Sequence, residues 1–299
     1  MQDTCRLCGG SHTFVRYRLG NHTVRRCRDC AFMWLTPVPT PEELRAVYGE
    51  GYFANDHFMS GQDSDIYGYY DYLAERFDRQ SGYVDFLREV RSGGFTGGEK
   101  PARLLDIGCG FGFLLDVAQD EGFQVEGVEF NERVVATAKA KYSFPIYCGD
   151  VADFPGKGYD VITMFDVIEH VLDPFAVIEK CCSMVRVGGL VVIVTMDSDS
   201  PVSLLFGKRL EDFRRVREHL TFWTRRSIGR LLEERGFGVK RIRYYGHTFK
   251  LGFLAKRVSM CSAALGWLPA KAVAAFGIAD VRIRLNPLTK MMVLAVRER

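Results

Sequence analysis

Beyond about residue 100, short apolar runs alternate with segments in which apolar residues recur every three or four positions. A strand covered on both faces is apolar throughout, whereas a helix that packs on a sheet has one apolar face. The alternation therefore predicts buried parallel strands joined by amphipathic helices. The expected fold class is α/β, with a doubly wound sheet.

Seven strands are expected in this part of the chain. They are 104–107, 123–128, the third within 146–150, the fourth at the start of 159–174 before a loop, 188–196, 237–245 and 290–296. Amphipathic segments follow the first two strands, as FLLDVAQDEGF and NERVVATAKAKY, and RRSIGRLLEERG precedes the sixth. Strands and helices thus alternate in the order that a doubly wound sheet requires.

The first expected strand ends in Asp106 and runs into a turn with Gly108, Gly110 and Gly112. Glycine at every second position permits positive φ angles and removes the Cβ atoms that would keep a bulky ligand away. The spacing differs from the dinucleotide fingerprint, because Phe113 stands three residues after Gly110. The turn therefore predicts a ligand site and weakens a nicotinamide or flavin interpretation.

Acidic residues end the next two expected strands. Glu129 stands nineteen residues after Gly110, where a carboxylate accepts both hydroxyl hydrogens of a ribose. Asp150 ends the third strand, where its carboxylate is placed to bind the exocyclic amine of adenine. The succession DIGCGFG, GVEFN, CGDV, FDVIEHV and VGGLVVIV resembles the class I S-adenosylmethionine-dependent methyltransferases over residues 101–296.

This resemblance implies S-adenosylmethionine as the cofactor and a seven-stranded Rossmann-like core. It also implies a cofactor site at the carboxyl edge of the sheet. The residues expected to contact the cofactor are Asp106, Gly108, Gly110, Gly112, Glu129, Asp150, Val151, Phe165 and Tyr70.

Two cysteine pairs stand near the N-terminus. Cys5 and Cys8 form one C-x2-C pair, Cys27 and Cys30 form the other, and eighteen residues separate the pairs. Four thiolates fill the tetrahedral shell of zinc and leave no place for a reactive water, so we expect a small structural zinc ribbon with four cysteine ligands. A rubredoxin-like iron site and unliganded cysteines are the alternatives.

The ribbon, a proline turn and a Tyr-Gly-x-x-Tyr-Phe element resemble the start of bacterial methyltransferases of sugar and secondary-metabolite pathways. These include zinc-containing sugar C-methyltransferases. The resemblance implies active-site roles for His170, after the fourth strand, and for the pair Glu218 and His219. Those enzymes carry a large additional C-terminal domain that has no counterpart in this sequence, so sugar C-methylation is an alternative.

The amino-acid composition is that of a globular protein and gives no sign of nucleic-acid binding. The chain has 299 residues, with 47% hydrophobic and 26% charged, as in ordinary globular proteins. A net charge of +3 is too small to imply nucleic acid by itself. The N-terminus lacks the pattern of a secretion signal, which favours a cytoplasmic location. Expected domains are a ribbon and connecting element, 1–60, a helical segment and linker, 61–100, and the methyltransferase core, 101–299.

About forty residues, 246–289, separate the sixth and seventh strands, which usually form a tight hairpin in this fold. One stretch of 22 residues there is nearly uncharged, but Pro269 and Lys271 interrupt it. Inserted helices that pack on the core or form a homodimer interface are favoured. A membrane-surface element is the alternative, with a peripheral location.

The expected function is O-methylation of a small-molecule acceptor from a sugar, secondary-metabolite or lipid-like class. His219 or His170 serves as general base, since imidazole accepts protons near neutral pH. A rival from another class is an RNA- or protein-binding module that uses the ribbon. It is supported by the ribbon's basic residues Arg6, Arg16, Arg18, Arg25, Arg26 and Arg28.

Overall fold

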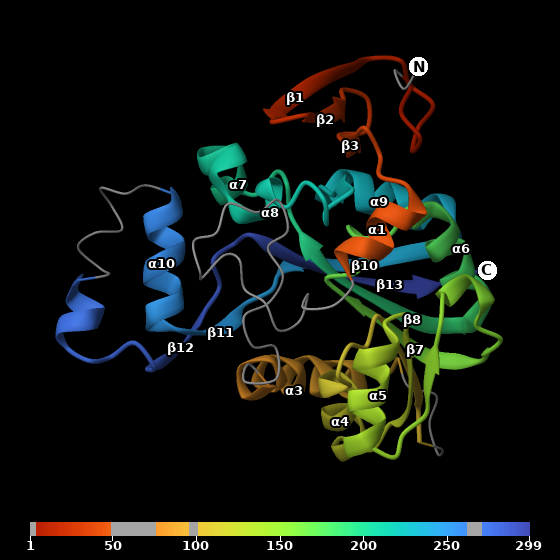
Figure 1. Ribbon diagram of the computed structural model, residues 1–299. Coiled ribbons are helices and arrows are strands. Elements are labelled where there is room, and N and C mark those ends of the chain that lie inside the picture. The colour runs from red at the N-terminus through yellow and green to blue at the C-terminus, as the bar shows by residue number, and fades with distance from the viewer. Residues whose placement is uncertain (1–3, 49–75, 96–100, 262–270) are drawn as a thin grey trace.

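A computed structural model describes residues 4–48, 76–95, 101–261 and 271–299 (Figure 1). Its centre is a seven-stranded sheet in the order β10-β13-β8-β7-β4-β5-β6. The bounds are β4 Arg103–Ile107, β5 Gln124–Glu129, β6 Ile146–Cys148, β7 Tyr159–Phe165, β8 Val185–Met196, β10 Phe237–Tyr244 and β13 Lys290–Arg297. Strands β4 to β8 pair in parallel, and β13 is antiparallel to both neighbours. The α/β prediction is confirmed.

Helices cover both faces of this sheet (Figure 1). On one face lie α3 Arg76–Ser92, α4 Phe113–Asp120 and α5 Glu132–Lys141; on the other lie α6 Pro174–Met184 and α9 Arg225–Glu234. Successive strand residues point to opposite faces. Leu104 accordingly belongs to the apolar core with α3 to α5, and Leu105 to the core with α6 and α9.

Helix boundaries follow local capping chemistry. Asn131 caps α5 by accepting hydrogen bonds from the backbone N–H of Arg133 and Val134. Thr224 and Ser227 form a reciprocal capping box at the start of α9. These caps satisfy backbone groups that have no partner inside the helix, so α5 and α9 begin where the sequence supplies a capping side chain.

The N-terminal ribbon forms a second sheet, of order β1-β2-β3-β9. Its first strands are β1 Thr13–Leu19, β2 His22–Cys27 and β3 Met33–Thr36, and α1 Pro41–Val47 follows. The fourth strand, β9 Thr221–Phe222, comes from the core and pairs antiparallel with β3. The ribbon and the core thus share one sheet, which the sequence pattern did not predict.

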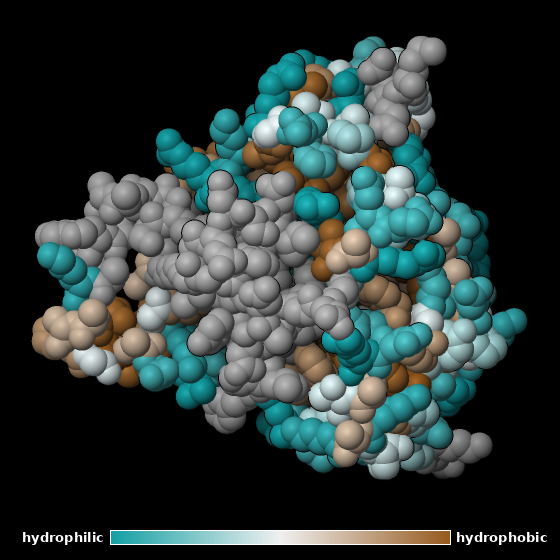
Figure 2. Space-filling view, in the orientation of Figure 1, coloured by the Kyte–Doolittle hydropathy of each residue, from teal (hydrophilic) through white to brown (hydrophobic). Residues whose placement is uncertain are grey.

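The segment between β8 and β9 contains α7 Pro201–Phe206, the 3-10 turn Gly207–Arg209 and α8 Glu211–Arg214. The insertion after β10 contains β11 His247–Lys250, α10 Leu251–Cys261 and β12 Arg282–Leu285. Strands β11 and β12 pair with each other, which was not predicted. Within the described residues, no helix is both long and apolar enough to cross a bilayer. Figure 2 shows apolar side chains at the outer end of the insertion, where Phe276 is 77% exposed.

Candidate active site

The glycine turn joins β4 to α4 at the carboxyl edge of the sheet. Gly108, Gly110 and Gly112 have φ angles of 69°, 52° and 79°, a region that side chains with a Cβ rarely adopt. A Cβ on Gly108 would lie 2.5 Å from Val167 Cγ2, and one on Gly112 would lie 2.8 Å from a ring carbon of Phe144. At these two positions glycine is therefore required by the backbone and by protein packing.

Glu129 ends β5 beside this turn and is 5% exposed. One carboxylate oxygen accepts a hydrogen bond from the backbone N–H of Gly110 at 3.0 Å, and the other accepts from that of Asn131 at 3.0 Å. Burial raises the pKa of Glu129. The two hydrogen bonds hold the carboxylate against the glycine turn, and each oxygen keeps a lone pair for a further donor.

Asp106 lies inside the sheet rather than at its rim. It is 4% exposed and its Oδ1 accepts a hydrogen bond from Thr163 Oγ1 at 2.6 Å. Burial raises the pKa of Asp106 to about 7, and the nearby charge of Glu129 adds to the increase. The side chain thus connects β4 to the neighbouring strand β7.

The remaining predicted cofactor residues lie at the ends of β6 and β7. Asp150 is exposed and caps the turn that contains Val151, accepting from the backbone N–H of Ala152 at 2.8 Å. Phe165 is half-buried and packs with Tyr83, Phe86 and Tyr245, with ring centroids 5.2 to 5.7 Å apart. Tyr70 lies outside the described residues.

His170 and His219 lie together, although they come from separate segments. Their ring centroids are 4.7 Å apart, with the planes inclined by 77°. His219 Nδ1 lies 2.8 Å from the carbonyl oxygen of Asp212, and His170 Nδ1 lies 3.0 Å from that of Glu218. A carbonyl only accepts, so Nδ1 of His219 carries the proton and its Nε2 is the acceptor. His170 Nδ1 also lies within hydrogen-bond distance of a hydroxyl, which can either donate or accept.

Both imidazoles are held in the neutral form. Burial lowers the pKa of His170 to about 4. Burial also lowers the pKa of His219, and the neighbouring His170 and Arg215 lower it further. The pair therefore offers two uncharged nitrogen acceptors at physiological pH.

The Glu218 carboxylate points away from this pair. It is fully buried and accepts a hydrogen bond from Arg215 Nη1 at 2.8 Å. Arg215 also forms an ion pair with Glu211, the first residue of α8. The Glu218 carboxylate thus fixes the backbone next to His219 by its contact with Arg215. The backbone carbonyl of Glu218 contacts His170.

Two neighbours of the imidazole pair were not singled out from the sequence. The Tyr48 hydroxyl lies 2.7 Å from His170 Nδ1, and the Tyr-Gly-x-x-Tyr-Phe element that begins at Tyr48 was the available signal. Glu169 is 2% exposed, and its Oε2 has no hydrogen-bond partner within the described residues. Polar atoms of Glu169, His170 and His219 lie within 4.8 Å of one another. Burial raises the pKa of Glu169 to about 8.

The four N-terminal cysteines form one cluster. The Sγ atoms of Cys5 and Cys30 are 3.5 Å apart, as are those of Cys8 and Cys27, and all four lie within 4.8 Å of one another. None forms a disulfide. In a tetrahedral thiolate site with metal–sulfur bonds of about 2.3 Å, the sulfurs are about 3.8 Å apart. The donor set and its spacing fit zinc.

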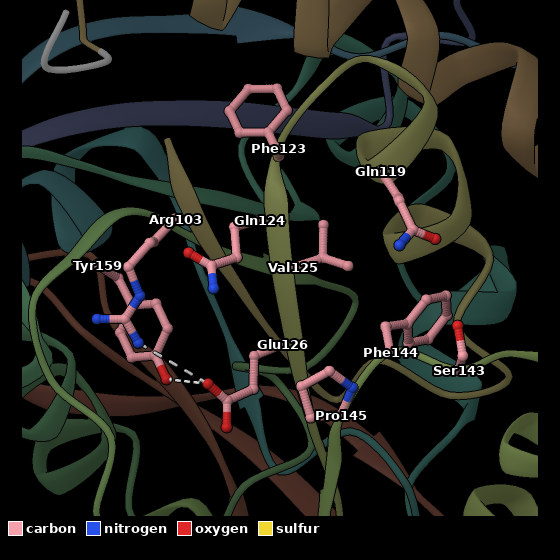
Figure 3. A pocket seen from close by; sticks show the side chains of 10 residues that line it. All are labelled: Arg103, Gln119, Phe123, Gln124, Val125, Glu126, Ser143, Phe144, Pro145 and Tyr159. Carbon is pink, nitrogen blue, oxygen red and sulfur yellow. Dashed lines mark hydrogen bonds and ion pairs between the residues drawn. The ribbon is translucent and has the colours of Figure 1, made fainter. Parts of the chain in front are cut away.

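A cavity of about 270 Å³ lies at the opposite edge of the sheet (Figure 3). Arg103, Gln124 and Tyr159 line it at the starts of β4, β5 and β7, and Glu126 accepts a hydrogen bond from the Tyr159 hydroxyl at 2.6 Å. Ligands of open α/β sheets bind at the carboxyl ends of the strands. This cavity therefore lies away from the candidate active site.

Comparison with known proteins places the chain in a family. A family model described as "Methyltransferase domain" matches residues 74–241. A ubiquinone biosynthesis O-methyltransferase of Bradyrhizobium diazoefficiens is 33% identical over 118 residues, which cover 38% of this chain and 46% of that protein. A protein of the same name from Nitrosospira multiformis is 27% identical over 176 residues, which cover 54% of this chain and 69% of that protein.

Among solved structures, the chain is similar to an S-adenosylmethionine-dependent methyltransferase from Archaeoglobus fulgidus. The identity is 22%, the TM-score is 0.48, and the alignment covers 75% of this chain and 98% of that one. The chain spans about half the length of the first ubiquinone O-methyltransferase and about two thirds of the second. The family match, which covers more than half of the chain and contains the glycine turn, shows that this protein belongs to the methyltransferase domain family.

Proposed function

We propose that this enzyme methylates a hydroxyl group of a small-molecule acceptor. The observation that carries the proposal is the pair of neutral imidazoles, half-buried His170 and buried His219, at the carboxyl edge of the sheet. Methyl transfer from a sulfonium is an in-line displacement, for which the enzyme positions the acceptor and removes its proton. An imidazole whose Nε2 is an acceptor suits that second task.

The cofactor is proposed to lie along the glycine turn, with its ribose at Glu129. The carboxylate accepts one backbone hydrogen bond at each oxygen and has capacity for the two ribose hydroxyls. Asp150, at the exposed end of β6, is proposed to bind the adenine amine. The proposed cofactor set is completed by Gly108, Gly110, Gly112, Asp106, Val151, Phe165 and Tyr70.

The lowered pKa of His170 restricts the acceptor. A base with a pKa of about 4 removes a proton from a phenol, whose pKa is about 10, far more readily than from an aliphatic alcohol. We therefore propose a phenolic or similarly acidic hydroxyl. The relatives named ubiquinone biosynthesis O-methyltransferase support this choice and a lipid-like acceptor.

Sugar C-methylation is the second candidate. It is favoured by the combination of a four-cysteine cluster with His170 and the pair Glu218 and His219. Incubation with labelled S-adenosylmethionine and either catechol-like phenols or nucleotide-linked deoxysugars distinguishes the two. Methyl ether products from phenols support the proposal, whereas a new carbon–methyl bond on the sugar contradicts it.

The ribbon is proposed to hold one structural zinc through Cys5, Cys8, Cys27 and Cys30. A segment of this size buries little apolar surface by itself, so the metal contributes to its folding. Two of the ribbon arginines are engaged within the protein: Arg26 binds Asp199, and Arg6 binds Asp173. These contacts disfavour a nucleic-acid-binding role for the ribbon.

The insertion after β10 is proposed to contact a membrane surface or a second copy of the chain. Phe276 and Val281 are 77% and 46% exposed, as large apolar side chains on its outer part. Such exposure is typical of surfaces that are covered by a partner. A lipid-like acceptor would be consistent with a peripheral membrane location.

A further inference from the structure

Leu220, the residue after His219, is hydrogen-bonded on both sides of its backbone. Its N–H donates to the carbonyl oxygen of Glu169 at 2.7 Å, and its own carbonyl accepts from the N–H of Leu35 at 2.9 Å. Glu169 precedes His170 in the loop after β7, and Leu35 belongs to strand β3 of the ribbon. One residue therefore connects the ribbon to both segments that carry the imidazole pair.

The imidazoles depend on the backbone of the same short segment. His170 Nδ1 hydrogen-bonds to the Glu218 carbonyl, and the Thr221 hydroxyl donates to the carbonyl of Ile168 at 3.3 Å. The regular structure of this segment is limited to β9, which has two residues. So short a strand holds its place through its neighbours rather than by itself.

Strand β3 of the ribbon pairs with β9 and follows the second cysteine pair, Cys27 and Cys30, within three residues. The N–H of Cys27 donates to the carbonyl of Phe32 at 2.9 Å, immediately before β3 begins. The Phe32 ring packs on Trp34 and on Trp223, with centroids 5.7 and 4.8 Å apart. The cysteine cluster, β3 and the residue after β9 thus form one packed unit.

An ion pair forms a second connection between the ribbon and the core. Arg26 of β2 makes two hydrogen bonds to the Asp199 carboxylate, at 2.5 and 2.7 Å, and the two side chains are 19% and 32% exposed. Asp199 follows β8, in the stretch that leads to the His219 segment. Bidentate pairs of this kind fix orientation as well as distance.

We propose that the ribbon is a positioning element of the methyl-transfer site. The metal-held cysteines fix β3, β3 fixes the backbone of Leu220, and the segment around Leu220 keeps His219 and His170 in contact. The proposal rests on the function proposed above for the two histidines. Leu35 and Arg26 are positioning residues in this account, because they act through Leu220 and Asp199 and do not touch the acceptor.

The first test removes the metal from the whole 299-residue chain with a chelator and follows backbone hydrogen exchange. We expect the amides of Leu35 and Leu220 to exchange at least about tenfold faster, while those of β4 and β7 keep their protection. The affinity for S-adenosylmethionine should remain within about twofold, since Glu129 lies on strand β5. Unchanged exchange at Leu35 and Leu220 after confirmed metal loss would overturn the proposal.

The second test uses Arg26→Gln, with Arg88→Gln as the matched control. Arg88 of α3 pairs with Glu121 and is 66% exposed, so the control removes the same charge from a contact of little energetic weight. Arg26→Gln should shift the imidazole NMR signals of His170 and His219 and lower kcat about tenfold or more, with cofactor affinity unchanged. Arg88→Gln should do neither.

The outcomes separate this proposal from the proposed function. Suppose that metal removal speeds exchange at Leu35 and Leu220 and that Arg26→Gln shifts the imidazole signals, but alanine variants of both histidines keep full turnover. The ribbon then positions the two histidines, and their assignment as general base is wrong. If chelation also opens β4 and β7 and abolishes cofactor binding, or if Arg26→Gln matches its control, the ribbon stabilises the whole fold without positioning the site, and the proposal is overturned.

Discussion

The imidazole rings of His170 and His219 meet edge to face, with centroids 4.7 Å apart. Each ring has a backbone carbonyl within hydrogen-bond distance of Nδ1, and half-buried His170 and buried His219 are both neutral. Two neutral acceptors at the carboxyl edge of the sheet are suited to take a proton from an acceptor held opposite the methyl donor.

Replacement of either histidine by alanine should lower turnover by about 10² to 10⁴ for the residue that serves as base. Affinity for S-adenosylmethionine should remain nearly unchanged, because Glu129 and the glycine turn are untouched. His12→Ala, on an exposed ring that pairs with Asp29, is the control. Wild-type turnover in both variants, measured with the authentic acceptor, would show that the hydroxyl needs no histidine.

Glu129→Gln should weaken S-adenosylmethionine binding more than tenfold, or by about 1.5 to 3 kcal/mol. The variant keeps the size of the side chain but replaces one acceptor oxygen by a donor, which opposes the backbone N–H of either Gly110 or Asn131. Calorimetry gives the affinity directly. Glu132→Gln, at an exposed position in the first turn of α5, controls for the lost charge. Equal affinities in the two variants would remove Glu129 from the cofactor site.

Cys27→Ser should reduce the zinc content of the purified chain and destabilise the ribbon. The reason is that a serine hydroxyl is a much poorer zinc ligand than a thiolate, and metal binding contributes folding energy to so small a unit. Elemental analysis and thermal unfolding measure the two effects. Cys148→Ser, at an exposed cysteine outside the cluster, should change neither. Iron in the wild-type protein, or no metal at all, would contradict the zinc assignment.

The raised pKa of Asp106 predicts that the stability of the cofactor-free protein depends on pH. Its pKa rises from 3.8 to about 7 on folding, because burial disfavours the charged form. The native state therefore keeps a proton that the unfolded chain has released, and the free energy of unfolding falls as pH rises from about 4 to about 7. At 1.36 kcal/mol per unit the change is roughly 4 kcal/mol.

Asp106→Asn should remove this slope, since the amide oxygen still accepts the Thr163 hydrogen bond and carries no charge. The variant should be more stable than the wild type above pH 7 and similar to it near pH 4. Urea unfolding at a series of pH values gives the difference curve. A constant difference across the range would mean that Asp106 does not titrate between these values.

The sequence by itself determined the elements of the core. The apolar run before Asp106 and the glycine positions at 108, 110 and 112 encode a buried strand and a tight turn through local sterics, so their structure agrees with the prediction. The cysteine spacing likewise brings Cys5 and Cys30 close, because a hairpin between the pairs suffices to do so.

Only the tertiary structure decided which distant residues meet. Glu218 precedes His219 in the sequence, yet its backbone carbonyl contacts His170, which comes from the loop after β7. The contact of His219 with His170, and that of Leu220 with Leu35, depend on the order of strands in two sheets. Sheet order is set by long-range packing of apolar faces, and no periodicity within one segment encodes it.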